Sequence, residues 1–235
     1  MLLGLTLAAV LVLVGLLLVL VDRQAATVAE RRASEFLSAS FGRPADVHVE
    51  GAPFLTQALR GRYRDVRVSG GGLRLGVLNG ASLDARLRNV YLSTRRVLGR
   101  QVEEMTCEHL SGRIVLPYAE LARVAKIPGL QLTHVGGRLL ASAALPVAGF
   151  DQIARVNGEA VWSVGGGGSV WLRIRGVSVV GIAVPSLVMS QLLPTLNVPI
   201  PLPELPFGLR IENLEPEPDG LAVTGSAAAP VFRRS

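Results

Sequence analysis

The middle of the chain alternates between apolar and polar residues with a period of two. Over residues 73–77 and 83–88, apolar side chains take every second position, and arginine or aspartate takes most of the positions between them. A strand of this kind buries one face and wets the other, which is typical of antiparallel sheets. Similar segments, joined by glycine-rich and proline-rich turns, predict further strands over residues 45–50, 63–69, 112–116, 130–133, 138–147, 151–164, 169–182, 207–214 and 221–225.

Three segments before residue 126 read as helices. Apolar residues recur at helical spacing from Arg23 to Ser40, where Gly42 and Pro44 then end the pattern. A short apolar helix is predicted over residues 53–59, and another over residues 117–125 with proline in its first turn. Few helices and many alternating strands predict an α+β fold, in which a long antiparallel sheet carries helices on one face.

The N-terminus, Met1–Val21, carries no charged side chain. As a helix it would be about 31 Å long, enough to cross the core of a bilayer. No small-residue cleavage site follows closely, which favours an anchor over a removed signal peptide. We therefore expect a transmembrane anchor or uncleaved signal over residues 1–22 and a single α+β domain over residues 23–235.

The orientation of such an anchor is left open by the charges. The nearest positive side chains, Arg23, Arg31 and Arg32, follow the apolar segment instead of preceding it. The positive-inside rule, taken literally, would place the domain in the cytoplasm. A start codon further upstream, with basic residues before the apolar run, is the alternative.

The composition excludes some classes of protein. Of the 235 residues, 49% are hydrophobic and 18% charged, which is too apolar for a disordered chain. The net charge is +6, and Lys126 is the one lysine among 24 basic residues. This arginine bias fits GC-rich codon usage, phosphate recognition or an anionic membrane surface. Nucleic acid is not expected as a partner, because aromatic residues are few and no binding motif is present.

Candidate catalytic and metal sites are missing from the sequence. The histidines His48, His109 and His134 are far apart, and Cys107 is the one cysteine. No zinc-binding motif, nucleophile elbow or phosphate-binding glycine loop occurs. We therefore expect no enzyme activity, no catalytic residue, no bound metal and no cofactor.

The segment from Val184 to Gly225 is unusually apolar for a region outside the sheet. Residues 184–193 predict an apolar helix with proline in its first turn. Prolines then recur at Pro199, Pro201 and Pro203, which predicts an extended, polyproline-type loop. So much apolar surface is expected either to be buried or to meet an apolar ligand.

Several short motifs resemble the LmeA-like phospholipid-binding family of actinobacterial envelope proteins. They are Asp22-Arg23 after the apolar N-terminus, Pro53–Gln57 with Gly61 and Val66–Val68, and Leu205–Arg210 with Asp219–Leu221. The resemblance implies an extracytoplasmic, membrane-associated protein that binds phospholipid, phosphoinositides in particular. It also implies a fold similar to the tubular lipid-binding proteins, in which a long curved antiparallel sheet wraps one or two helices, and a link to lipomannan-type glycolipid assembly.

If the ligand is a phospholipid, the pattern of apolar and basic residues suggests which residues contact it. Candidate acyl-chain contacts are Phe54, Leu55, Leu59, Leu187, Val188, Leu192 and Leu193. Candidates for a membrane-docking loop are Val198, Ile200 and Leu202. Candidates for an anionic headgroup are Arg60, Arg62 and Arg64. Two alternatives stay open: the proline-rich loop packs back onto the sheet, and the arginines form an ordinary solvated strand.

The expected function is phospholipid binding in an apolar groove on the outer side of the plasma membrane. The expected partners are an anionic, phosphoinositide-type lipid and the membrane, and no oligomeric state is indicated. Two other functions stay open: a structural partner in a membrane complex, and an enzyme of envelope glycolipid synthesis.

Overall fold

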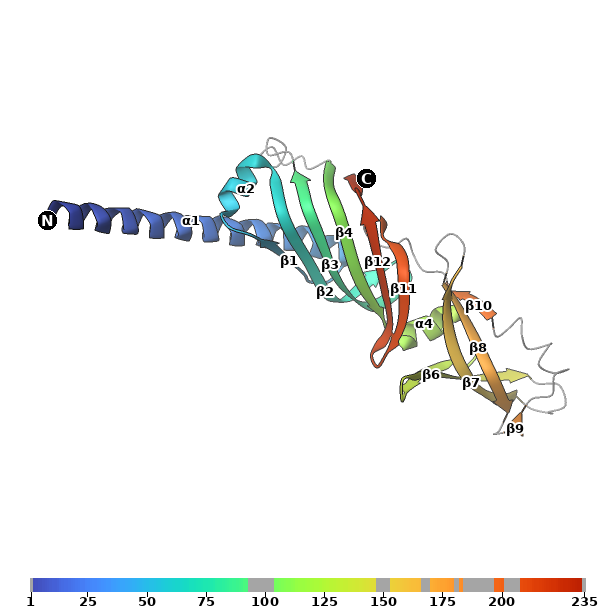
Figure 1. Ribbon diagram of the computed structural model, residues 1–235. Coiled ribbons are helices and arrows are strands. Elements are labelled where there is room, and N and C mark those ends of the chain that lie inside the picture. The colour runs from blue at the N-terminus through green and yellow to red at the C-terminus, as the bar shows by residue number, and fades with distance from the viewer. Residues whose placement is uncertain are drawn as a thin grey trace. The chain divides into compact units, whose positions relative to one another are not determined.

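The computed structural model describes residues 2–92, 104–146, 153–165, 170–179, 182–183, 197–200 and 208–233 (Figure 1). The chain divides into two compact units. Unit 1 comprises residues 1–70, 84–110 and 227–235, and unit 2 comprises residues 71–83 and 111–226.

Three helices and two antiparallel sheets make up the described fold. The helices are α1 (Leu2–Phe41), α2 (Phe54–Arg60) and α4 (Tyr118–Ala125). The strands are β1 (Ala45–Glu50), β2 (Arg62–Leu75), β3 (Leu78–Leu92), β4 (Glu104–Leu116), β5 (Gln131–Val135), β6 (Arg138–Pro146), β7 (Ile153–Val164), β8 (Val170–Val179), β9 (Ile182–Ala183), β10 (Asn197–Ile200), β11 (Arg210–Glu217), β12 (Gly220–Ala228) and β13 (Val231–Arg233).

The strands form one sheet of seven and one of six. The first has the order β1-β2-β3-β4-β12-β11, with β13 also paired to β4. The second has the order β10-β8-β7-β6-β5, with β9 also paired to β8. The predicted α+β class is confirmed, but the single long sheet is wrong. Pro117 and α4 separate β4 from β5, and at this helix the chain leaves the first sheet for the second.

The alternating pattern predicts correctly which side chains are buried. Leu83, Ala85 and Leu87 are buried in β3, whereas Asp84 and Arg88 are exposed. The same holds for β8, where Val170, Leu172 and Ile174 are buried on one face. Burying each of the leucine, isoleucine and valine side chains among them contributes on the order of 1.5–3 kcal/mol to folding. One dry face per sheet therefore supplies most of the described core.

Helix α1 is a single helix from Leu2 to Phe41, so the predicted helix from Arg23 continues from the apolar N-terminus without a break. From residue 22 onward, half-buried positions recur three or four residues apart, as in a helix with one packed face. The sequence also predicts a transmembrane helix over residues 1–22. Within the described part of the chain, no helix is both long enough and apolar enough to cross a bilayer.

Helix α1 also covers the edge of the seven-stranded sheet at β1, where the backbone N–H groups of alternate residues have no neighbouring strand among those described. Three α1 side chains, four residues apart, accept these N–H groups. The pairs are Ser38 Oγ with Ala45 at 2.9 Å, Ser34 Oγ with Val47 at 2.9 Å, and Glu30 Oε1 with Val49 at 2.8 Å. A sheet edge that is covered in this way cannot pair with another chain.

The predicted polyproline conformation is wrong for residues 197–200, which form β10 and pair with β8. Pro199 lies opposite Trp171 in this register. Strand β10 ends the order of the described six-stranded sheet, and an edge strand tolerates proline because its outward side needs no N–H donor. The predicted helix over residues 184–193 and the rest of the proline-rich segment lie outside the described residues.

Candidate functional site

The first helix–helix junction in unit 1 is built around Asp22. Pro53 occupies the N-cap position of α2 and offers no side-chain oxygen to the orphan N–H groups of the first turn. Asp22, at the end of the apolar part of α1, supplies that cap. Its Oδ2 accepts the N–H of Phe54 at 2.8 Å, and its Oδ1 accepts the N–H of Leu55 at 2.7 Å. The carboxylate therefore fixes α2 against α1, and Figure 1 shows the two helices side by side.

Gln57 holds the other side of the same junction. Its side chain is buried, Nε2 donates to the carbonyl of Gly51 at 2.7 Å, and Oε1 accepts the N–H of Arg64 at 3.0 Å. Gly61 ends α2 in the left-handed conformation, with φ of 62°, which favours glycine. Residues 53–57 and Gly61, one of the motifs behind the family resemblance, thus have a structural role here.

The C-terminal motifs of the resemblance are structural as well. Leu209 is buried, and its Cδ1 would lie 2.7 Å from a Cβ added at Gly112. A Cβ at Gly220 would lie 2.2 Å from the carbonyl oxygen of Leu116. At Gly112 the Leu209 side chain could shift to make room, whereas at Gly220 the clash is with backbone atoms, so close packing within unit 2 requires glycine at Gly220.

The candidate acyl-chain residues on α2 fall into two classes. Phe54 is buried and packs on Tyr63, with ring centroids 6.0 Å apart. Leu55 and Leu59 face outward instead, with 37% and 79% of their surface exposed. The other four candidates, Leu187, Val188, Leu192 and Leu193, lie outside the described residues.

The three candidate headgroup arginines follow one another through the turn from α2 into β2. Arg60 ends α2, while Arg62 and Arg64 lie two residues apart in β2, and all three are exposed. The guanidinium of Arg62 lies 5.3 Å from the centroid of the Tyr91 ring and 3.9 Å from Glu108 Oε1. The three arginines are therefore exposed and close together along the chain.

The Glu108 carboxylate interacts more closely with Tyr91 and Asn89 than with Arg62. The hydroxyl of Tyr91 donates to Oε1 at 2.5 Å, and Asn89 Nδ2 donates to Oε2 at 2.6 Å. These two hydrogen bonds, followed by the nearby positive charge of Arg62, lower the pKa of Glu108 below its usual value. Part of the charge of Arg62 is thus balanced within the protein.

The candidate docking loop is only partly described. Ile200 is 1% exposed and belongs to β10, and Val198 is half-buried in the same strand. The prediction that Ile200 contacts a membrane from a loop is therefore wrong, because its side chain points into the core of the six-stranded sheet. The alternative, in which the loop packs onto the sheet, is correct for this residue. Leu202 lies outside the described residues.

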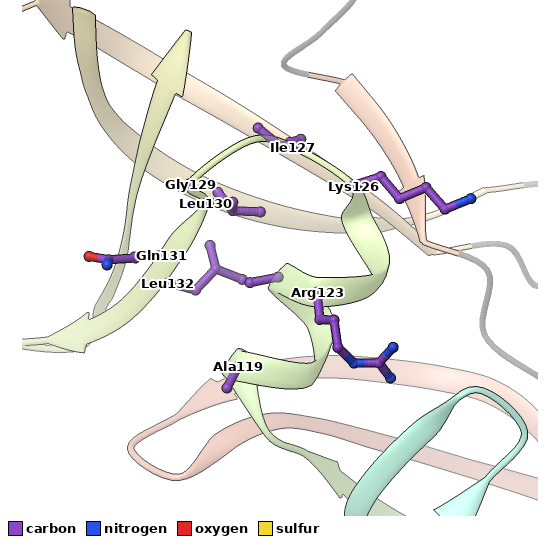
Figure 2. Close-up of a pocket in the computed structure, with 9 residues that line it drawn as sticks. Ala119, Arg123, Lys126, Ile127, Gly129, Leu130, Gln131 and Leu132 are labelled. Carbon is purple, nitrogen blue, oxygen red and sulfur yellow. The ribbon is translucent and has the colours of Figure 1, made fainter. Parts of the chain in front are cut away.

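A pocket of about 480 Å³ lies between α4 and the segment that enters β5 (Figure 2). It is open to solvent, and alanine, isoleucine and leucine side chains form most of its wall. Figure 2 shows Leu132 turned toward α4, with the charged ends of Arg123 and Lys126 pointing away from β5. The lining residues are Ala119, Ala122, Arg123, Lys126, Ile127, Gly129, Leu130, Gln131 and Leu132. No sequence pattern reveals this pocket, because its two walls come from elements that share no motif.

The two cations at the rim of this pocket differ in their surroundings. Arg123 donates to Glu120 Oε2 at 2.6 Å and to the carbonyl of Val77 at 2.5 Å. The hydrogen bond from Arg123, helped by the N–H of Asn79, lowers the pKa of Glu120 to about 2. Lys126 caps the C-terminus of α4 with φ of 55° and is exposed. The Arg123 guanidinium is therefore engaged within the protein, whereas the Lys126 ammonium is exposed and points away from β5.

No group of three or more His, Cys, Asp or Glu side chains in the described ranges is arranged to hold a metal ion. Cys107 is buried, and burial raises the pKa of its thiol. A thiol in that state is a poor nucleophile.

Comparison with known proteins extends these observations. No curated protein and no solved structure matches the chain. Residues 20–226 match the protein family described as LmeA-like phospholipid-binding. The match covers most of the chain, including Asp22, the α2 junction, the pocket and the β11–β12 hairpin, and it confirms the resemblance drawn from the motifs. The chain therefore belongs to the LmeA-like phospholipid-binding family.

Proposed function

We propose that the protein binds an anionic phospholipid of the phosphatidylinositol type, and that it works by binding and not by catalysis. The observation that carries this proposal is the family match over residues 20–226. Arginine-rich surface beside exposed leucine, as on α2, suits a ligand with an anionic head and an apolar body.

The pocket between α4 and β5 is our candidate for part of the acyl-chain site. Its volume of about 480 Å³ falls within the usual range for ligand pockets, about 300–1,000 Å³. Leu130 and Leu132 give it an apolar wall, and Lys126 stands at its rim. Each CH₂ group buried there contributes about 0.8 kcal/mol, so several methylene groups suffice for stable binding.

The proposed location is the outer side of the plasma membrane, where phospholipid binding supports the assembly of lipomannan-type glycolipids. Residues 13–21 of α1 expose apolar side chains, which supports association with a membrane. A reporter that is active only outside the cytoplasm, fused after Ser235, tests the location. Activity of a cytoplasmic reporter alone would overturn it.

The binding proposal is tested by native mass spectrometry of the full chain released from membranes in mild detergent. We expect co-purified phospholipid, with phosphatidylinositol enriched over its share of the membrane. A different phospholipid would overturn the headgroup assignment but keep the family function. A lipid-free protein in several detergents would favour a structural partner, and turnover of a glycolipid donor would favour an enzyme.

A further inference from the structure

Helix α1 changes character at Asp22. Between residues 13 and 21 every large apolar side chain is between 46% and 63% exposed, on all sides of the helix. A helix that is apolar all round needs an apolar environment on every side. Figure 1 shows this half of α1 extending beyond β1 and α2. Asp22 is the first charged residue after this apolar stretch.

Helix α2 is fixed at the same level. Asp22 accepts the N–H groups of Phe54 and Leu55, so the first turn of α2 lies beside the end of the apolar stretch. From this position α2 exposes Leu55 and, more fully, Leu59. The exposed apolar surfaces of α1 and α2 therefore lie next to each other, because the Asp22 carboxylate holds the start of α2 at the end of the apolar stretch of α1.

We propose that α2 is the surface by which unit 1 rests on an anionic phospholipid bilayer. The apolar part of α1 enters the lipid, Leu59 lies at the boundary of the hydrocarbon, and Arg60 and Arg64 lie among the headgroups. This inference rests on the proposed function only in requiring that the protein works at a phospholipid membrane. It does not depend on which lipid occupies the pocket.

The positive charge near α2 complements the negative charge of an anionic bilayer, which favours the bilayer as the partner. Arg60, Arg62 and Arg64 are exposed immediately after the leucines of α2, and Arg23 follows Asp22 on α1. Although Glu108 balances part of the charge of Arg62, the other three arginines add positive charge at this level. Anionic lipid headgroups attract such a cluster over a distance of about one Debye length.

The contacts between α1 and β1 show how far β1 lies from the proposed membrane contact. Ser38 accepts the N–H of Ala45, and at about 1.5 Å per residue Ser38 lies about 24 Å along α1 from Asp22. Asp46, next to Ala45, is exposed and is therefore about as far from the proposed membrane contact. A probe at Asp46 is a matched control for a probe at Leu59, because both sites are exposed and both belong to unit 1.

The test uses the full chain with Leu59→Cys or Asp46→Cys, each labelled with an environment-sensitive fluorophore. Cys107 is buried, so the unsubstituted chain measures background labelling. The proteins are reconstituted into phosphatidylcholine vesicles with and without phosphatidylglycerol. We expect a blue shift and a several-fold rise in emission at position 59 and little change at position 46, with the larger effect in anionic vesicles.

An aqueous spectrum at position 59 in vesicle-bound protein would overturn the proposal, as would equal shifts at both positions. Adding Arg60→Gln and Arg64→Gln should remove most of the difference between anionic and neutral vesicles, and an unchanged difference would overturn the role of the arginines. Phospholipid retained in the native mass spectrum, with no shift at position 59, would refute this inference alone. Lipid-free protein with the shift intact would refute the proposed ligand alone.

Discussion

Asp22 accepts the backbone N–H of Phe54 at 2.8 Å, and through its second oxygen it also caps Leu55. The two partners lie in different helices, and α2 has no cap from its own N-cap residue, Pro53. One side chain at the end of the apolar stretch thus determines where α2 begins and where it sits on α1.

Asp22→Ala should lower the free energy of unfolding by about 1–3 kcal/mol, because it leaves two N–H groups of α2 without their charged acceptor. Thermal unfolding in one detergent measures the change. Arg23→Ala is the control, since the side chain of Arg23 is exposed and neighbours the cap without forming it. Equal melting temperatures for Asp22→Ala and the unsubstituted chain would show that the cap does not stabilise the fold.

The contact between Asp22 and α2 also illustrates which parts of the fold can be predicted from the sequence. The helices and most strands were predictable, because periodicity reports which face of each element is buried. The partners of Asp22 and Gln57 were not predictable, because the hydrogen-bonded groups come together only through the packing of α1, α2 and β2. The motifs indicate the family from sequence alone, whereas their structural role is visible only in the folded protein.

Ser34→Ala should expose the edge of β1 locally. The Oγ of Ser34 accepts the N–H of Val47, and its loss leaves that donor part-buried without a protein acceptor, at a cost of about 1–3 kcal/mol. Hydrogen exchange should become faster at Val47 than at its neighbours in β1. Thr27→Ala is the control, because the Thr27 hydroxyl donates to the Arg23 carbonyl within its own helix. Unchanged exchange at Val47 would contradict the proposed covering of the edge.

Ile200→Asp should destabilise unit 2 by several kcal/mol, because it places an unpaired carboxylate in the core next to β8. Pro199→Asp is the matched control, since Pro199 is exposed in the same strand. A melting temperature that falls for both variants, or for neither, would contradict the assigned register. The prolines led to the prediction of a loop instead of strand β10. An edge strand tolerates proline, but the sequence does not reveal which strands lie at an edge.

Acid should weaken the contact of α4 with Asn79 and Val77. The pKa of Glu120 is lowered to about 2 by Arg123 and Asn79, so its ionised form stabilises the fold above the unfolded pKa of about 4.5. That contribution is lost as the pH falls from about 4.5 to about 2. In Glu120→Gln this part of the pH dependence should disappear from the melting curves, while Glu215→Gln should keep it. The effect is modest, because Arg123 is about half exposed.

The pocket between α4 and β5 was not predictable either, since no motif links Ala122 on the helix to Leu132 on the strand. Each residue alone fits the pattern of its own element, and a hollow between two elements depends on the packing distance that side-chain volumes set. The composition shows the excess of positive charge. The structure shows in addition that Lys126 lines this pocket and that Arg123 donates a hydrogen bond to Glu120.

Ala122→Phe should separate lipid binding from folding. The larger side chain fills part of the pocket, and Ala122 is only half-buried, so the cost to the core is small and the melting temperature should change little. The fraction of protein that retains phospholipid in the native mass spectrum should fall, because the acyl chain loses the apolar wall between Ala122 and Leu132. Thr133→Phe adds similar bulk at an exposed position of β5, next to Leu132 on the opposite face, and should leave the bound fraction unchanged. Equal lipid occupancy in Ala122→Phe and the unsubstituted chain would exclude this pocket as the acyl-chain site.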